Sequence, residues 1–252
     1  MNGKRILAAV LAAAMTASSF TIDAFADSIT PHTDITDNSA KNTVATYTTD
    51  DNTDNSVLAG STIVNCASLD ELQSEHPYAE NSDITYVYTD TNCNNLKITF
   101  SLDTYFGLGN TYLTIYDGDD NQVDTSRSHD LAGISVYVPG NTVKLRFRSD
   151  NSMSYYGFKV ASVENADKMP TQGDPEYDYV LELFGTNTEN PVYSIKKYKG
   201  AGGDIVIPSE IDGRKVISIG GAAFTDCTTD INVTVSDGIS DLTGGAFGND
   251  CS

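Results

Sequence analysis

Apolar and polar residues alternate along several short stretches in the middle of the chain. The clearest stretches are NLKITFSLD (95–103), TYLTIYDG (111–118) and NTVKLRFRS (141–149). In the last of them the apolar residues are separated by three cations, Lys144, Arg146 and Arg148. A period of two is typical of strands that pack one face and expose the other to water. The pattern therefore predicts half-buried antiparallel strands.

Turn-forming residues separate these stretches. Glycine, asparagine, aspartate and proline cluster at 107–110, 117–121 and 139–141. Short strands at this spacing predict an antiparallel β-sandwich of about a hundred residues. The cluster DGDDN (117–121) shares part of a calcium loop but lacks the glycine and the distal glutamate that an EF-hand requires, so a hairpin turn is expected there.

A second β region is expected after a linker. The linker KMPTQGDPE (168–176) contains two prolines and a glycine and has no apolar pattern. Apolar residues then alternate in YVLELF (179–184) and again in VYSI (192–195), with turn residues between them. This pattern predicts a β-hairpin.

One motif near the end of the sequence occurs twice, as GGAAFTDC (220–227) and GGAFGNDC (244–251). Phe224 and Phe247 stand 23 positions apart, and INVTV (231–235) alternates between the two copies. A fixed period of roughly 20–29 residues with one short strand each predicts a leucine-rich-repeat solenoid. In such a solenoid Ala-Phe packs under the neighbouring coil, and Cys227 and Cys251 are expected to be buried structural thiols.

The first 26 residues have the features of an export signal. Lys4 and Arg5 precede an apolar stretch at 6–15, and Ala24-Phe25-Ala26 has the small-x-small form that a signal peptidase cuts. Residues 27–60 are rich in Thr, Asp, Asn and Ser and are expected to form a flexible acidic leader. No later stretch is long and apolar enough to cross a bilayer. The protein is therefore expected to be secreted and extracellular, with cell-surface association as an option and no membrane insertion after cleavage.

The composition excludes one class of partner. The chain holds 35 acidic and 15 basic residues, for a formal net charge of -20. Such a surface repels phosphate backbones, so no nucleic-acid partner is expected. Among the four cysteines, Cys66 and Cys93 fall in one predicted domain, where a disulfide and two free thiols are both open alternatives.

The sandwich region resembles a CUB domain. TYLTIYDG is followed about thirty residues later by LRFRSDNSMSYYGFKV (145–160), and HPYAEN (76–81) is similar to the family's entry into the fold. CUB domains often bind calcium through three acidic positions, and the matching residues are Asp103, Thr111 and Asp150. The resemblance therefore implies a calcium site on Asp103 and Asp150, and the alternative is that these aspartates only shape turns. No other cofactor is expected.

The second region resembles the opening of BspA-like leucine-rich repeats. The matching stretch is DIVIPSEIDGRKVISIGGAAFTDC (204–227). Together, the two resemblances imply an exported bacterial surface protein. The expected fold is mainly β, a CUB-like antiparallel sandwich followed by the hairpin and first coils of a solenoid. Since a solenoid needs about three repeats and a cap, the sequence is expected to be the front of a longer protein.

These observations divide the chain and suggest a function. The expected parts are 1–26 signal peptide, 27–60 leader, 61–165 sandwich, 166–176 linker and 177–252 incomplete repeats. No placed set of nucleophile, base and orienting group is evident, so a non-enzyme is expected that binds extracellular proteins or glycans in adhesion.

Aromatic residues in the loops are the candidate contacts for such a ligand. Tyr105, Tyr155 and Tyr156 are candidates for a ligand-binding platform, and edge packing of the sandwich is the alternative. Two other functions stay open: the accessory part of an exported hydrolase or peptidase whose catalytic domain is missing, and a structural envelope protein.

Overall fold

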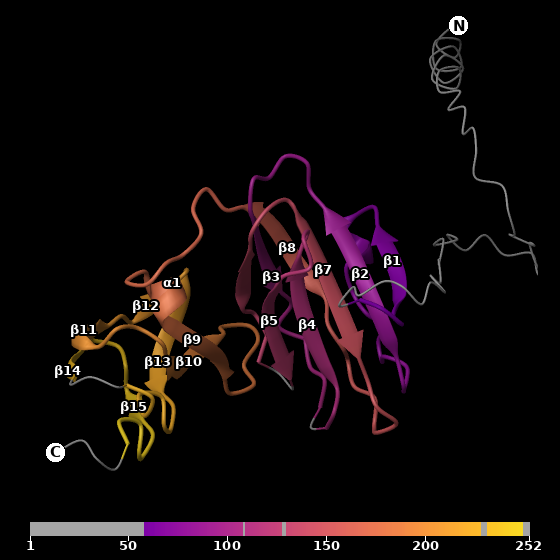
Figure 1. Cartoon of the computed structure of the whole chain (residues 1–252). Helices are drawn as coiled ribbons and strands as arrows, with labels where there is room; N and C mark the ends of the chain where they lie inside the picture. Colours follow the sequence, from indigo (N-terminus) through magenta and orange to yellow (C-terminus); the bar gives the residue numbers. More distant parts are fainter. Residues whose placement is uncertain (1–57, 108, 128–129, 228–230, 249–252) are drawn as a thin grey trace, which may run out of the picture. The chain divides into compact units, whose positions relative to one another are not determined.

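A computed structural model describes residues 58–107, 109–127, 130–227 and 231–248 (Figure 1). The predicted signal peptide and nearly all of the predicted leader lie outside the described residues, as does Cys251. The described part is mainly β, as the sequence predicts, and its strands form several sheets. No helix within it is long and apolar enough to span a membrane.

The largest sheet of the first region has five strands in the order β1-β2-β7-β4-β5 (Figure 1). Their bounds are β1 Thr62–Cys66, β2 Asp83–Thr89, β4 Tyr112–Asp117, β5 Gln122–Arg127 and β7 Thr142–Arg148. Strand β1 runs parallel to β2, and the other neighbours are antiparallel. A second sheet has the order β6-β3-β8, with β3 at Leu96–Phe100, β6 at Ser135–Val138 and β8 at Val160–Asn165.

One hydrophobic core joins these two sheets. Ile98 of β3, Leu113 of β4 and Leu145 of β7 are all fully buried in it. Burying such side chains is the main favourable contribution to folding, about 1.5–3 kcal/mol for each. The arrangement is consistent with the predicted β-sandwich, and the alternation predicted for β7 is confirmed, since Val143, Leu145 and Phe147 are buried in this core.

The turn at 117–121 is a hairpin turn, as predicted. It joins β4 to β5, and Asp117 closes it with its own carboxylate. Asp117 Oδ1 accepts hydrogen bonds from the backbone N–H groups of Asp119 and Asn121, both at 2.9 Å, and Oδ2 accepts one from Asn121 Nδ2 at 3.0 Å. Burial alone would raise the pKa of Asp117, but these hydrogen bonds and Lys144 outweigh it and lower that pKa.

A short helical turn, η1 (Leu69–Glu71), follows β1. Ser68 occupies its N-cap position but makes no side-chain capping bond. The Glu71 carboxylate instead accepts the backbone N–H of Ala67 at 2.7 Å. The N–H that Glu71 accepts belongs to Ala67 and not to Ser68, so Ser68 and Glu71 do not form a reciprocal capping box.

The described residues of the second region form a short helix, α1 (Pro175–Asp178), and seven strands. The strands are β9 Tyr179–Phe184, β10 Val192–Tyr198, β11 Gly203–Ile207, β12 Glu210–Ile211, β13 Arg214–Ile219, β14 Ile231–Val235 and β15 Asp241–Leu242. The predicted hairpin is confirmed as the antiparallel pair of β9 and β10. Three pairs are parallel: β10 with β13, β13 with β15, and β11 with β14. These strands surround their own hydrophobic core.

The two copies of the repeated motif lie against each other. Ser218 pairs with Asp241 and Ile219 with Leu242, which reproduces the 23-residue offset of the sequence. The rings of Phe224 and Phe247 stack with their centroids 5.1 Å apart. Ala223, Phe224 and Ala246 are buried, as expected.

Cys227 differs from the prediction of a buried thiol. It is only half-buried at the edge of the second core. The physical reason is its place three residues after the buried Phe224, at the exposed end of the turn that the motif forms.

Some residues near the edges of the expected parts are packed against the fold. Leu58 is already buried, and Ser61 Oγ donates to its carbonyl at 2.8 Å, so the packed region includes residues assigned above to the leader. Within the predicted linker, Ala166 is buried and α1 begins at Pro175.

Replacing Asp117 by alanine is expected to lower the free energy of unfolding by about 1–3 kcal/mol, because the turn's N–H donors lose their acceptor. Asp119→Ala is the matched control, since the Asp119 side chain is exposed and makes no hydrogen bond within the described part of the chain. Denaturant unfolding followed by circular dichroism measures both. Equal losses in the two variants would contradict this role for Asp117.

The same substitution has an expected pH dependence. A lowered pKa in the folded state means that the contribution of Asp117 is complete above the unfolded pKa of about 3.9 and is lost as pH falls through the folded value. The stability difference between the wild type and Asp117→Ala should therefore shrink on acidification. Unfolding curves at neutral and acidic pH test this, and a difference that grew toward low pH would contradict it.

Candidate functional site

Polar side chains form cross-strand rows on the outward face of the five-stranded sheet. In one row Asp83 pairs with Arg148, Arg148 with Tyr112, and Tyr112 with Arg127, on the adjacent strands β2, β7, β4 and β5. We call these four residues the arginine–tyrosine row. Directly paired residues on neighbouring strands stand close enough for their side chains to interact.

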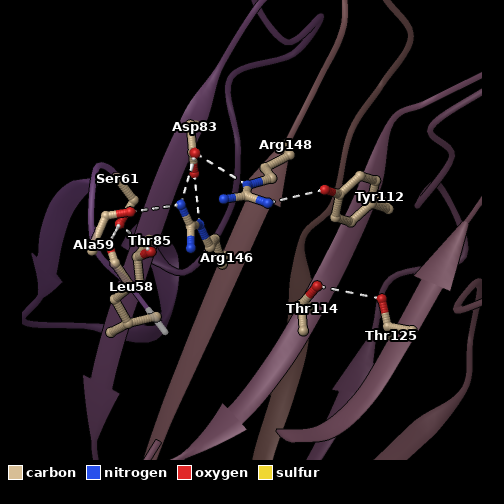
Figure 2. Close-up of polar contacts among 10 residues, drawn as sticks. All are labelled: Leu58, Ala59, Ser61, Asp83, Thr85, Tyr112, Thr114, Thr125, Arg146 and Arg148. Atoms are coloured by element: carbon tan, nitrogen blue, oxygen red, sulfur yellow. Dashed lines mark hydrogen bonds and ion pairs between the residues drawn. The ribbon is translucent and has the colours of Figure 1, made fainter. Parts of the chain in front are cut away.

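The carboxylate of Asp83 holds two arginines (Figure 2). Arg146 makes a bidentate contact with this carboxylate: its Nε donates to Oδ1 at 2.7 Å and its Nη2 donates to Oδ2 at 2.8 Å. Arg148 adds a bond from Nε to Oδ2 at 3.1 Å. Two-armed arginine–carboxylate pairs are among the strongest polar contacts in proteins. Because the Arg146 side chain is only 6% exposed, this contact is the buried end of the cluster.

Arg146 also ties the start of the packed region to the sheet. Its Nη2 donates to the carbonyl of Ala59 at 3.1 Å, and Ser61 Oγ lies 2.8 Å from Thr85 Oγ1 beside it. Figure 2 shows Leu58, Ala59 and Ser61 on one side of the arginines and Tyr112 on the other. The cluster therefore has a covered side at Arg146 and an open side at Arg148, whose side chain is 39% exposed.

Tyr112 lies between two guanidinium groups. Arg148 Nη1 donates to its hydroxyl at 3.1 Å, and the Arg127 guanidinium lies over its ring, 5.6 Å from the centroid. The hydrogen bond to Tyr112, with the neighbouring Asp83, raises the pKa of Arg148 above its ordinary value. The guanidinium groups of Arg127 and Arg148 carry N–H donors that can donate hydrogen bonds to an anion.

The sequence contains one signal for this cluster. Three cations alternate along β7 in a chain with a net charge of -20. Alternation placed all three on the outward face, but it could not identify Asp83 or Tyr112 as their partners. These come from strands that are distant in sequence, and the sheet order brings them together.

The three tyrosines proposed as a platform take part in two different ring contacts. Tyr105 and Tyr155 meet edge to face, with centroids 4.8 Å apart. Tyr156 instead stacks on His76 at 3.9 Å. The structure thus groups two of the predicted residues and places the third in a separate contact.

Gly107 allows the Tyr105–Tyr155 contact. It has a positive φ of 76°, and a Cβ there would lie 2.1 Å from the Tyr155 ring. Tyr105 is also tied to Gly157 by reciprocal backbone hydrogen bonds of 2.9 Å. Backbone geometry as well as ring packing therefore holds this pair in place.

The two candidate calcium ligands have separate local partners. Asp103 is exposed and accepts a bond from Ser101 Oγ at 3.3 Å. Asp150 accepts the backbone N–H groups of Asn110 at 3.1 Å and Ser152 at 2.9 Å, and these hydrogen bonds, with that of the Ser152 hydroxyl first, lower its pKa. Within the described residues no group of three or more His, Cys, Asp and Glu side chains is arranged to hold a metal.

Thr111, the third position of the calcium pattern, favours a ligand. Its hydroxyl oxygen is buried and has no hydrogen-bond partner among the described residues. A buried hydroxyl left unpaired costs about 1–3 kcal/mol, so a bound group beside it would gain a contact. Calcium takes six to eight oxygens, and these three positions supply two carboxylates and one hydroxyl.

Cys66 and Cys93 are both free thiols in the structure and are not joined to each other. Cys66 is buried and donates to the carbonyl of Glu71 at 3.3 Å. Burial, with Glu71 nearby, raises the pKa of Cys66 to about 11, so this thiol is protonated and unreactive at neutral pH. Of the two alternatives left open by the sequence, the structure has the free thiols.

Comparison with known proteins gives little beyond this geometry. No family model matches the sequence, and no curated protein matches it. Among solved structures, the full extracellular region of zebrafish Gpr126/Adgrg6 is similar with a TM-score of 0.32 and 16% identity, covering 40% of this chain and 14% of that chain. The CUB1-EGF-CUB2 domains of rat MASP-1 are similar with a TM-score of 0.31 and 16% identity, covering 57% of this chain and 62% of that chain. Both scores are low, so neither likeness carries an argument about function.

The calcium prediction is tested by thermal unfolding of the full chain. Calcium binding to the folded state alone would raise the melting temperature, so millimolar calcium should stabilise the wild type and leave Asp150→Ala unchanged. The readout is the increment on adding calcium, because Asp150→Ala also loses local hydrogen bonds. Asp119→Ala should keep the increment. A wild type with no increment would mean that Asp103 and Asp150 only shape their turns.

Proposed function

We propose that this chain is a secreted, non-catalytic recognition protein that binds extracellular proteins or glycans at a cell surface. The observation that carries the proposal is the pair Tyr105 and Tyr155, held together on neighbouring loops of the sandwich. Tyrosine combines a large apolar ring with a hydroxyl, and it is enriched in binding interfaces for that reason.

The loops that carry this pair are fastened to the core. Tyr78 Oη donates to the carbonyl of Phe106 at 2.7 Å, one residue after Tyr105. Phe106, next to Tyr105, and Phe158, three residues after Tyr155, are fully buried. A surface that is ordered before binding loses little conformational entropy when a ligand arrives, which favours affinity.

We also propose a protein family for each of the two regions. Residues 61–165 would be a CUB-like sandwich, supported by the alternating strands, the two sheets and their shared core. Residues 177–252 would be the beginning of BspA-like leucine-rich repeats. The 23-residue pairing of β13 with β15 and the stacked rings of Phe224 and Phe247 support this assignment.

Secretion is proposed from the basic, apolar and small-residue order of the first 26 residues. A non-catalytic role is proposed because the described side chains identified above are engaged in packing and turn formation. Asp117 and Asp150, for example, each accept hydrogen bonds from their own turns.

The recognition role is tested with the purified full chain on a printed glycan array and on immobilised mucin. The double variant Tyr105→Ala, Tyr155→Ala should lower binding at least about thirtyfold, since central aromatic residues of an interface commonly contribute about 2 kcal/mol or more. Tyr177→Ala is the matched control, an exposed tyrosine in α1. Tyr105→Phe, Tyr155→Phe keeps the rings and should retain most binding.

Two results would overturn the proposal. One is a wild-type chain that binds neither surface, or a double variant that binds as the wild type does while its melting temperature shows it is folded. The other is sustained turnover of casein or of nitrophenyl glycosides by the wild type, which would place the chain among hydrolases.

A further inference from the structure

The arginine–tyrosine row contains more positive than negative charge. Asp83 is the one acid in the row, and its carboxylate already binds both Arg146 and Arg148. Arg127 is exposed and forms no salt bridge with a described residue. The face therefore keeps a local positive charge in a protein whose overall charge is -20.

Donor groups in the row remain available. Arginine has five N–H donors, and Arg148 uses only Nε and Nη1 in contacts with described residues, toward Asp83 and Tyr112. Arg127 contributes its guanidinium to a ring contact and to no hydrogen bond within the described ranges. Two guanidinium groups thus present donors on either side of the Tyr112 ring.

The arginines of this face already bind one carboxylate, that of Asp83. Asp83 is a carboxylate bound by both arms of one arginine and one arm of another, so the cluster contains its own example of carboxylate recognition. Arg127 and Arg148 stand on strands two positions apart, a separation on the order of 10 Å. A ligand that met both would carry carboxylates spaced along its length.

The sheet topology distinguishes between two kinds of acidic ligand. Peptides bound by β proteins commonly add a strand to a free sheet edge, where the backbone is unpaired. Strands β7 and β4 are central and hydrogen-bonded on both sides, so the face over them offers side chains alone. Side-chain donors around an aromatic ring suit a carbohydrate better than an extended peptide.

We propose that the arginine–tyrosine row binds the carboxylates of an acidic, uronic-acid polysaccharide. Arg127 and the open side of Arg148 supply the charged donors, and Tyr112 lies between them. Asp83 and Arg146 hold Arg148 in position and do not need to touch the ligand. This surface and its ligand class are separate from the tyrosine loops, so the inference stands or falls independently of the proposed function.

The overall charge of the protein determines how such binding behaves. The many acids elsewhere repel a polyanion, while charge contacts at the row attract it over a short range. Salt screens exposed charges within about 8–10 Å at physiological strength, so affinity should fall as salt increases. Neutral polysaccharides should not bind at the row.

The test measures binding of polygalacturonate to the full chain by isothermal titration calorimetry at low salt. The wild type should bind, and Arg127→Gln with Arg148→Gln should weaken binding about tenfold or more through the loss of two charge-assisted contacts. Lys168→Gln is the control, since that lysine is 69% exposed outside the row and paired with Asp174. It should change affinity by less than about twofold.

A second set of variants separates binding from folding. Arg127→Gln alone removes an exposed side chain without touching Asp83, and its melting temperature should match the wild type. It should still weaken binding, and Arg127→Lys should restore only part of the loss because lysine lacks the planar fork. Weakened binding with unchanged stability supports the proposal.

Three outcomes would overturn the inference. The first is a wild type that does not bind polygalacturonate. The second is a loss in Lys168→Gln as large as that in the double variant, which would mean general electrostatic attraction. The third is equal binding of polyglutamate, lost through the same substitutions, which would identify an acidic polypeptide as the ligand.

Discussion

The packing around Phe147 determines much of the first region. Its side chain is almost fully buried on the inward face of β7, next to the end of the strand, and its ring lies 5.0–5.8 Å from those of Tyr78, Phe106 and Phe158, centroid to centroid. These three neighbours come from segments outside the strands. Because successive residues of a strand point to opposite faces, burying Phe147 also sends Arg146 and Arg148 outward. One buried ring thus helps position the candidate surfaces on both sides of the sheet.

The outward arginines create an electrostatic requirement that Asp83 satisfies. Arg146 is nearly buried, and a guanidinium removed from water is costly unless a charged partner accepts its hydrogen bonds. The two-armed contact with Asp83 provides that partner, and the Ala59 carbonyl adds an acceptor. Since the same carboxylate also orients Arg148, the stability of the covered end and the geometry of the open end are linked. Tyr112 continues this chain of contacts toward Arg127.

In the second region two similar segments pack against each other, and β13 runs parallel to β15. Ile219 pairs with Leu242, and the Phe224 backbone N–H donates to the carbonyl of Ala246 at 2.8 Å. Each copy of the motif covers an apolar surface of the other, which neither could bury alone. Because the two similar segments contact each other, the 23-residue spacing in the sequence is also the offset between the paired residues of β13 and β15.

Alternation along the sequence predicted β3, β4 and β7 and the outward direction of the β7 cations, because the period of two is a local property of extended backbone. For the same reason the Asp117 turn, the β9–β10 hairpin and the spacing of the two motifs followed from neighbouring residues. Neighbouring residues did not determine which strands pair with each other in the sheets. That β2 and β4 flank β7, so that Asp83 and Tyr112 meet Arg148, depends on how two sheets bury one shared core. Tertiary packing likewise determined the ring contacts of the three tyrosines. The Tyr156 ring stacks on His76, while the rings of Tyr105 and Tyr155 contact each other.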